Sequence, residues 1–581
     1  MGSNAHNINK LFCILLTVMD PDELQLHTKF VGPMPVINHF MDRLHLDDIM
    51  RRRLPVDHDP DTVQCIGIMI RNILVSREPI YGIREWAEKY PPALLGIGTD
   101  QVEKLNDDRI GRSLDRLFDA DRSSLMTEIV VHAVREFDLS MKRFHNDSTS
   151  VALSGLYRMA TGKDMRMKKT VNLTFGHSKD HRKDLKQLVW ILTVTSDGAV
   201  PVHYRVADGN TNDSPTHIET WDSIRKLTGR SDFLYVADSK LCSDANVKYI
   251  EEKHGRFLTV LPATWKEYNQ FLEWIQSHPV VWGETVHGKK EDRGQVWKLV
   301  ESPLQSSSGF RIVWVWSSQK AKHDKEIRDG IMRKAILELD KLETRLRSRK
   351  CRLHSIEDVK EAAETVIGKG RRWVGFRISE QTIERKVQET RGRPGSKTKY
   401  RTVIRKQFHV DWKPEEENID FDETCDGMFP LITNDRKLSL KEILSNYKYQ
   451  PHVEKRHEQL KSVYGVAPVL LKNVGRIEGF LFVYFLALLI ESLIEREVRN
   501  NMMKEERKSI QIYPEFRSCE SPTTDRVLGD FSLVQLNWIE AGRKIVKKFL
   551  PKLTHRQEEL LGLAGIPLDS YQQDWNAVPG G

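Results

Sequence analysis

Cysteine is scarce in this 581-residue chain, and its spacing argues against two classes of protein. The six cysteines form no Cys-x-x-Cys pair; they are Cys13, Cys65, Cys242, Cys351, Cys425 and Cys519. Scattered single cysteines argue against a disulfide framework and against a zinc ribbon. They fit the reducing cytoplasm, where we expect the protein to reside.

Long apolar runs are also missing. A membrane-spanning helix needs about 20 consecutive apolar residues. The apolar run at 11–19 follows one lysine, but no small-residue cleavage site comes after it, which argues against a signal peptide. The run at 479–490 is short and is flanked by Glu478 and Glu491. We therefore predict a buried core helix at 479–490 and no membrane partner.

The sequence contains no phosphate-binding loop, dinucleotide fingerprint or nucleophile elbow, so three common types of enzyme have no support. Charged residues make up 30% of the chain and hydrophobic residues 39%, and the net charge is +8. This composition is typical of a globular protein rather than a disordered one. The length exceeds that of one ordinary core and predicts two to four domains.

The first 137 residues have the apolar spacing of helices, interrupted by prolines. We predict a small helical N-terminal domain over 1–137. Such a domain could bind DNA through a helix-turn-helix, or it could be a packing or dimerisation unit. No helix in this region has an obviously basic face, so both interpretations stay open.

From residue 138 the pattern changes to short β-rich runs separated by helical stretches. This alternation predicts an α/β (α+β) fold with a mixed sheet flanked by helices. We expect a first core segment over 138–262, a mixed, β-rich insertion over 263–426 and a second core segment over 427–505. A C-terminal helical region over 506–581 would include a helix at 534–550.

Two aspartates follow apolar runs of predicted strands. Asp147 follows RFHN, and Asp238 follows FLYVA. Taken singly, such an aspartate is more often a helix cap or an Asx turn than a catalytic group. If the two strands are neighbours, however, the carboxylates emerge side by side and need a cation or a proton between them. Carboxylate oxygens of this kind suit Mg²⁺.

The stretch YKYQPHVEKRHEQLK at 447–461 carries a third acid. Tyr447, Glu454 and Lys461 have the spacing Tyr-x2-Arg-x3-Glu-x6-Lys, with Gln450 in place of the arginine. In this respect the chain resembles the DDE transposases of bacterial insertion sequences, whose catalytic core is RNase H-like. The resemblance extends over most of the chain, including FHNDSTS (144–150), GHSKDHRKDLKQ (176–187), ADGNTND (207–213) and RIEGFLFVYFLALLIESLIERE (476–497).

The resemblance implies roles for named residues. Asp147, Asp238 and Glu454 would be the catalytic acids and would bind two Mg²⁺ or Mn²⁺ ions. Glu458 lies one helical turn after Glu454, but the spacing to Tyr447 and Lys461 selects Glu454. On one continuous helix, Glu454 and Lys461 would share a face. Without the resemblance, solvated ion pairs would be the preferred interpretation.

The resemblance also implies contacts with DNA. Tyr447 and Lys461 would contact the phosphates of the transposon ends. Gln450 would be expected at the same surface, although it lacks the charge and the bidentate geometry of arginine. The neighbouring Lys455 or Arg456 could replace that charge.

The predicted insertion contains a strongly basic segment. Residues 371–406 hold twelve Lys or Arg against three acids, a net charge of +9, and such a segment favours double-stranded DNA. Within it, RGRPG at 391–395 resembles the core of an AT-hook, with Arg391 and Arg393 entering an A·T minor groove. A glycine turn that joins two strands is an equally good interpretation.

For two other polar clusters we favour an interpretation without catalysis or metal binding. His177, Asp180 and His181 have the spacing of metal ligands on a helix, but a polar, DNA-facing loop explains them better because no further ligand set is evident. The acids at 415–426 lie in an expected loop, so we interpret them as solvated.

The sequence thus predicts a cut-and-paste transposase that cleaves DNA at insertion-sequence ends and transfers the strands into target DNA. Two ends must be held together, which implies a homodimer or a larger multimer. One alternative is an RNase H-like nuclease without strand transfer. The other is a catalytically inactive DNA-binding protein derived from a transposase.

Overall fold

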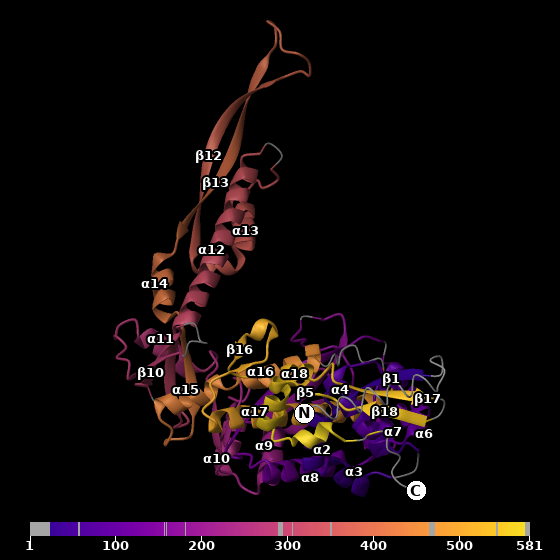
Figure 1. Cartoon of the computed structure of the whole chain (residues 1–581). Helices are drawn as coiled ribbons and strands as arrows, with labels where there is room; N and C mark the ends of the chain where they lie inside the picture. The colour runs from indigo at the N-terminus through magenta and orange to yellow at the C-terminus, as the bar shows by residue number, and fades with distance from the viewer. Residues whose placement is uncertain are drawn as a thin grey trace. The chain divides into compact units, whose positions relative to one another are not determined.

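The structure is a computed structural model that describes residues 24–575, apart from 56–58, 156, 158–159, 181, 289–293, 305, 349–350, 464–470, 542–543 and 574. The apolar run at 11–19 lies outside the described residues. The chain forms two compact units: Met1–Phe257 with Asn446–Gly581, and Leu258–Ser445. Figure 1 shows the elements of both.

A mixed sheet lies at the centre of the first unit. Its strands are β2 (Arg143–Leu153), β5 (Lys186–Thr195), β6 (Pro201–Ala207) and β7 (Leu234–Val236), in the order β6-β5-β2-β7. β5 is antiparallel to β2 and to β6, whereas β7 is parallel to β2. Strand β8 (Arg256–Val260) follows β7 in this order, and the chain enters the second unit within β8.

The first unit contains helices where the apolar spacing predicts them. The N-terminal part contains α2 (Met34–Arg43), α3 (Leu46–Arg53), α4 (Thr62–Val75), α5 (Ile83–Ala87), α6 (Thr99–Val102), α7 (Asp107–Asp119) and α8 (Arg122–Glu136). The side chain of Asp61 accepts a hydrogen bond from the backbone of Gln64 and caps α4, which is apolar and almost wholly buried. The connections between the strands contain α9 (Thr216–Thr228) and α10 (Asp244–Glu252).

The helix predicted at 479–490 is the middle of α17 (Val474–Lys504). This helix is long and apolar enough to cross a membrane, but 94% of its most apolar window is buried inside the chain. Glycines let it pack closely: a Cβ atom on Gly479 would lie 2.7 Å from the backbone oxygen of Leu114 in α7. The prediction of a core helix is confirmed.

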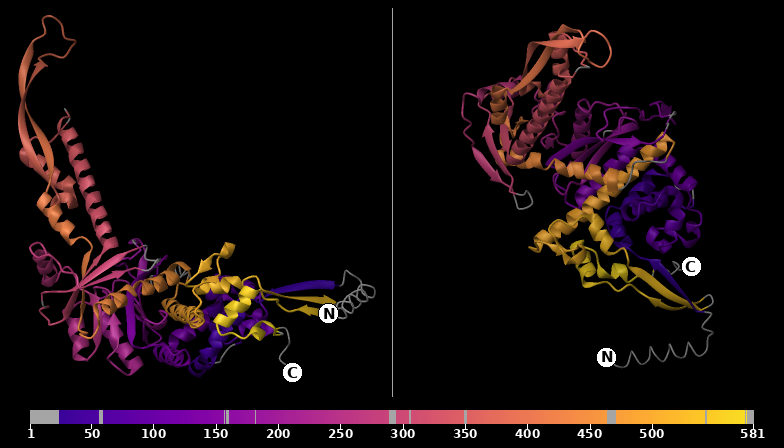
Figure 2. Two further views of the ribbon diagram at one scale, coloured as in Figure 1. Left: turned by 60° about the vertical axis from the view of Figure 1, so that its left-hand side comes forward. Right: turned by 90° about the horizontal axis from the view of Figure 1, so that it is seen from above.

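The prediction of a helix at 534–550 is wrong. This segment forms the strands β17 (Gln535–Ala541) and β18 (Lys544–Phe549), and β1 (Leu24–Phe30) pairs with β17 (Figure 2). Leu536 and Trp538 are buried, whereas Gln535 and Asn537, which alternate with them, are not. This alternation has the period of a strand, and pairing with β1 satisfies the backbone.

The second unit has its own strand order, β8-β14-β11-β10-β9, with antiparallel neighbours. The strands are β9 (Glu284–His287), β10 (Val296–Glu301), β11 (Arg311–Ser317) and β14 (Met428–Thr433). Helix α11 (Lys266–Trp274) stacks Phe271 on Trp314, with ring centroids 3.9 Å apart. The segment expected to begin the second core segment, from residue 427, thus forms β14 and belongs to this unit.

Between β11 and β14 the second unit contains helices and a two-stranded ribbon. The helices are α12 (Ser318–Leu346), α13 (Ile356–Ile367) and α14 (Glu416–Cys425), and the ribbon consists of β12 (Val374–Gln388) and β13 (Tyr400–Pro414). α15 (Leu440–Lys448) leads back to the first unit. The predicted fold class, α/β (α+β) with an interrupted RNase H-like core behind N-terminal helices, is confirmed.

The loop expected at 415–426 is instead the helix α14. Glu416 and Glu417 lie in its first turn, where the helix dipole favours acids. Arg372 binds Asp422 through two hydrogen bonds of 2.7 and 2.8 Å. Asp422 is therefore an ion-pair partner inside this unit rather than a solvated group.

Candidate active site

The strand register places two of the predicted acids side by side. β2 and β7 are parallel, and His145 lies opposite Val236. Asp147 and Asp238 each come two residues later, so they occupy equivalent positions on neighbouring strands. Asp238 follows the end of β7 as expected, but Asp147 lies inside β2, because Ser148, Thr149 and Ser150 continue the pairing with β5.

The electrostatics of these two aspartates reflect burial and proximity. Burial raises the pKa of Asp147 above its ordinary value, against the lowering effect of Lys179. Burial also raises the pKa of Asp238, and the negative charge of Asp147 adds to this. Two neighbouring carboxylates with raised pKa values favour a bound cation.

The third acid comes from α16 (Pro451–Glu458). Glu454 lies in its first turn and is exposed, while the adjacent Val453 is buried. Although much of the side chain is exposed, partial desolvation of its carboxyl and the charge of Asp147 raise the pKa of Glu454. Burial, and after it the negative charges of Glu454 and Asp238, raise the pKa of the Tyr447 hydroxyl.

The three acids interact electrostatically, but their side chains do not form a preformed metal-binding cluster. In the part of the chain that the structure describes, no three His, Cys, Asp or Glu side chains are close enough to hold a metal ion. The donor set itself fits Mg²⁺ or Mn²⁺, because it consists of carboxylate oxygens whose pKa values are raised.

Lys179 is a site residue that the sequence did not single out. Its Nζ lies 3.4 Å from Asp147 Oδ1, 3.2 Å from Ser148 Oγ and in contact with the Ser148 carbonyl oxygen. The backbone N–H of Lys179 donates to Ser150 Oγ at 2.9 Å, which fixes the loop against β2. Lys179 lowers the pKa of Asp147, Asp238 and Glu454, so it supplies positive charge to all three acids.

His457 is a second residue of the site that spacing did not reveal. Its Nε2 lies 3.5 Å from Asp147 Oδ2. Burial, with the charges of Lys179 and Lys461, lowers the pKa of His457 to about 3. The imidazole is therefore neutral at pH 7 and packs against Asp147 without competing as a cation.

Gln450, at the arginine position of the signature, lies in the interior. It is 8% exposed, and its Nε2 donates to the Asn146 carbonyl oxygen at 2.8 Å. Its Oε1 lies 3.3 Å from His145 Nδ1. The amide therefore ties the start of α16 to the residues just before Asp147, and the expected contact of Gln450 with DNA does not fit this position.

Lys461 does not share a helical face with Glu454. α16 ends at Glu458, and Lys461 lies in a π-helical turn, Gln459–Val463. Both oxygens of Asp180 accept hydrogen bonds from Lys461 Nζ at 2.8 Å. Asp180 is thus an ion-pair partner, which fits the interpretation of residues 176–187 as a polar loop rather than a metal site. His181 lies outside the described residues.

The other proposed cations have different positions. Arg456 is buried and forms an ion pair of 2.9 Å with Glu495, so it cannot replace the missing arginine at the surface. Arg391 and Arg393 belong to the second unit, in the loop that joins β12 to β13. The glycine turn considered for this segment is therefore present, and Gly392 has a φ of 153°.

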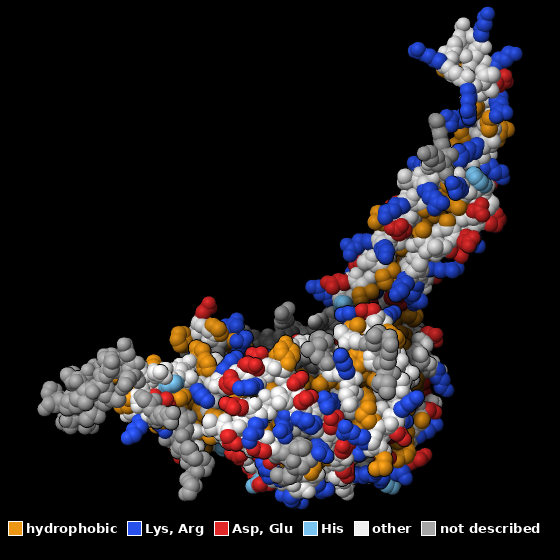
Figure 3. Space-filling model, turned by 90° about the vertical axis from the view of Figure 1, so that its right-hand side faces the viewer, with side chains coloured by type: hydrophobic (Ala, Val, Ile, Leu, Met, Phe, Trp, Pro, Cys, Tyr) orange, Lys and Arg blue, Asp and Glu red, His pale blue; other side chains and the backbone are white. Residues whose placement is uncertain are grey.

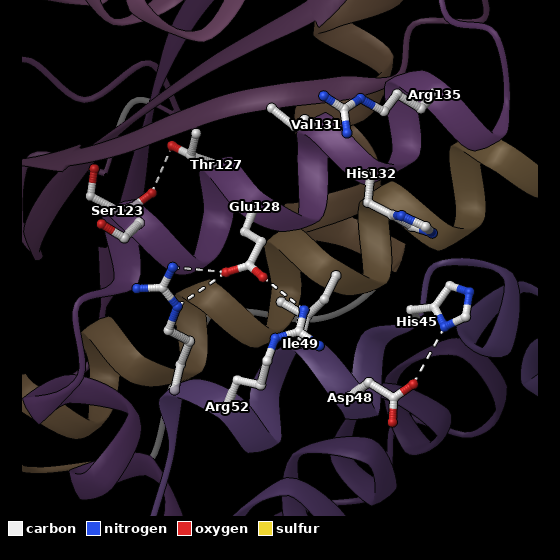
Figure 4. Close-up of a pocket in the computed structure, with 12 residues that line it drawn as sticks. His45, Asp48, Ile49, Arg52, Ser123, Thr127, Glu128, Val131, His132 and Arg135 are labelled. Carbon is white, nitrogen blue, oxygen red and sulfur yellow. Dashed lines mark hydrogen bonds and ion pairs between the residues drawn. The ribbon is translucent and has the colours of Figure 1, made fainter.

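A separate cavity of about 680 Å³ lies between α3 and α8 in the N-terminal helices (Figure 4). Its single glutamate, Glu128, accepts hydrogen bonds from Arg52 at 2.7 Å and from Arg53 at 3.0 Å. His45 is 3.3 Å from Asp48. Since Glu128 already has two arginine partners and Asp48 is the cavity's one other acid, this cavity lacks the carboxylate cluster that phosphodiester chemistry needs.

Two regions of the chain match known protein families. Residues 147–490, more than half of the chain, match the family described as "Transposase DDE domain". The chain therefore belongs to the DDE transposase domain family, and the resemblance inferred from the sequence is confirmed. Residues 26–131 match "Domain of unknown function (DUF4277)". No curated protein matches the chain.

Two solved structures show distant similarity. A piggyBac transposase synaptic complex with hairpin DNA is 9% identical, with 88% of this chain and 82% of that chain covered and a TM-score of 0.37. The Mos1 transposase paired-end complex with left transposon end is 8% identical, with 33% and 61% covered and a TM-score of 0.14.

Proposed function

We propose that this DDE transposase cleaves DNA at the ends of an insertion sequence and transfers the freed strands into target DNA. The observation that carries the proposal is the equivalent placement of Asp147 and Asp238 on two parallel, neighbouring strands, with Glu454 within electrostatic reach. Asp147, Asp238 and Glu454 would together hold two Mg²⁺ or Mn²⁺ ions. When bound, such ions activate the attacking oxygen and stabilise the leaving oxygen of an in-line displacement.

The surrounding residues position the acids and the DNA. Gln450 and Val453 fix α16 against β2, so that Glu454 faces the same region as Asp147. Tyr447, which senses the charges of Glu454 and Asp238, and Lys461, which is paired with Asp180, would contact phosphates of the element ends, with Asp180 exchanged for a phosphate at Lys461. In the second unit, Arg391 and Arg393 would bind the same double-stranded DNA.

The proposal also requires assembly. Two element ends must be joined to one target, and a homodimer or larger synaptic multimer supplies the necessary proximity. The reaction would take place in the cytoplasm. Among the described residues all five cysteines have free thiols, as that reducing compartment allows.

The test is a strand-transfer assay with Mg²⁺, a duplex that carries the element's own ends and a target plasmid. Joining supports the transposase, cleavage alone would indicate a nuclease, and binding alone would indicate an inactive derivative. Asp147→Asn, Asp238→Asn and Glu454→Gln should each abolish cleavage and joining while end-binding persists. Glu458→Gln is the matched control, because Glu458 is exposed on the same helix. Full activity of any of the three acid variants would overturn the assignment.

A further inference from the structure

The ribbon of β12 and β13 has a covered half and a bare half (Figure 1). Near its base, Val374, Phe408 and Val410 are buried against α12 and α13, with Phe376 and Ile378 packed beside them. Beyond these residues no element packs on the ribbon in the described part of the second unit, and its side chains are largely exposed. An isolated two-stranded ribbon is marginally stable, so the covered base must support the bare half.

The bare half has two chemically different faces. On one face, the register pairs Ile383 with Arg405, Arg385 with Val403, and Val387 with Arg401. We call these six residues the arginine face. On the opposite face, the same register pairs Thr382 with Lys406, Glu384 with Ile404, and Lys386 with Thr402.

The charges of the two faces differ. The arginine face has three guanidinium groups and no acid, so its charge is +3. The opposite face has two lysines and one glutamate on the same three rungs. In addition, Glu380 forms an ion pair of 2.7 Å with Lys406. Among the described residues, Arg385, Arg401 and Arg405 have no acidic partner of this kind, and Lys and Arg side chains gather at this end of the ribbon (Figure 3).

We propose that the arginine face binds the major groove of double-stranded DNA. The major groove is wide enough to admit a two-stranded β-ribbon. Arginine binds phosphate oxygens or the O6 and N7 atoms of guanine bidentately, and β-branched side chains contact thymine methyl groups and sugars. On the arginine face, three arginines alternate with Ile383, Val387 and Val403, so the face supplies both kinds of contact. Covering this face with DNA also removes aliphatic surface from water.

This inference deepens the proposed function and rests on it, because it names the surface that holds the DNA. The continuing loop adds cations at Arg391, Arg393, Lys397 and Lys399. The arginine face differs from that loop because its spacing is fixed by the strand register. It therefore gives a directional contact rather than diffuse attraction.

The experiment compares two double variants of the full chain in which adjacent positions are changed. Arg385→Gln with Arg405→Gln removes two cations from the arginine face. Lys386→Gln with Lys406→Gln removes two cations from the opposite face. Binding to a fluorescent element-end duplex is measured by anisotropy at several salt concentrations. For the arginine pair we expect at least about tenfold weaker binding and a salt slope smaller by about 2, while the lysine pair changes affinity less than about threefold.

A second measurement identifies which groove of the DNA the ribbon contacts. Dimethyl sulfate methylates guanine N7 in the major groove and adenine N3 in the minor groove. The parent chain should protect guanine N7, and the arginine pair should lose that protection. Equal losses of affinity for both variants, unchanged affinity of the arginine pair, or protection of adenine N3 alone would overturn the inference. Cleavage by Asp147→Asn would instead overturn the proposed function, so the two failures are distinguishable.

Discussion

Lys179 Nζ lies 3.4 Å from Asp147 Oδ1, so an ammonium group is in contact with the central acid of the site. Its loop is anchored to the same strand through Ser150. Asp147 is the acid whose charge affects both Asp238 and Glu454. Lys179 and a divalent cation therefore compete for one carboxylate, and this relationship leads to the first prediction.

We expect Lys179→Met to bind Mn²⁺ roughly three- to tenfold more tightly than the parent, because a competing positive charge is removed from a partly exposed site. Isothermal titration calorimetry without DNA measures this directly. Lys183→Met is the control, since Lys183 is an exposed lysine of the same loop. Weaker Mn²⁺ binding by Lys179→Met would show that Lys179 organises the acids rather than competing with the ion.

The raised pKa of Asp147 gives a pH dependence with a definite sign. The folded state holds the proton of Asp147 more tightly than the unfolded state, whose pKa is near the ordinary 3.8. Ionisation of Asp147 therefore lowers stability as pH rises from about 3.8 through the raised pKa. In EDTA at pH 7, Asp147→Asn should raise Tm by about 1–3 °C, and the gain should vanish below the ordinary pKa. A lower Tm at pH 7 would mean that attraction to Lys179 outweighs burial.

The sequence predicted the neighbouring positions of Asp147 and Asp238 better than it described their surroundings. Asp238 lies past a strand end as expected. The continuation of β2 through Ser148, Thr149 and Ser150 was not predicted, because these polar residues have no apolar alternation and only their pairing with β5 shows that they are extended. The contact of Lys179 with Asp147 depends on a loop fold that spacing does not encode. The segment 534–550 satisfies a helical spacing as well as a strand alternation, and pairing with β1 decides between them.

Gln450 provides a prediction that separates positioning from DNA contact. Gln450→Ala leaves the Asn146 carbonyl oxygen without its donor, which should lower stability by about 1–3 kcal/mol. Because α16 is then less well held against β2, we expect cleavage at saturating DNA to slow about tenfold, with the Kd for the element end within twofold.

The control for Gln450→Ala is Glu458→Ala, an exposed substitution in the same helix that should leave stability unchanged. Single-turnover cleavage and thermal unfolding are measured in parallel for both. A raised Kd for DNA with normal cleavage at saturation would show that Gln450 contacts DNA after all.

The ion pair between Lys461 and Asp180 predicts that removing an acid strengthens DNA binding. Asp180 holds Lys461 Nζ through two bonds of 2.8 Å, and a phosphate must displace it. Asp180→Asn should therefore tighten element-end binding about threefold at low salt and steepen the salt slope by about 0.9. Asp184→Asn is the control, because it removes an equal charge from the same loop but releases Arg182. Adding Lys461→Ala to Asp180→Asn should abolish the gain; a gain that persists without Lys461 would show that phosphate does not replace Asp180 at this lysine.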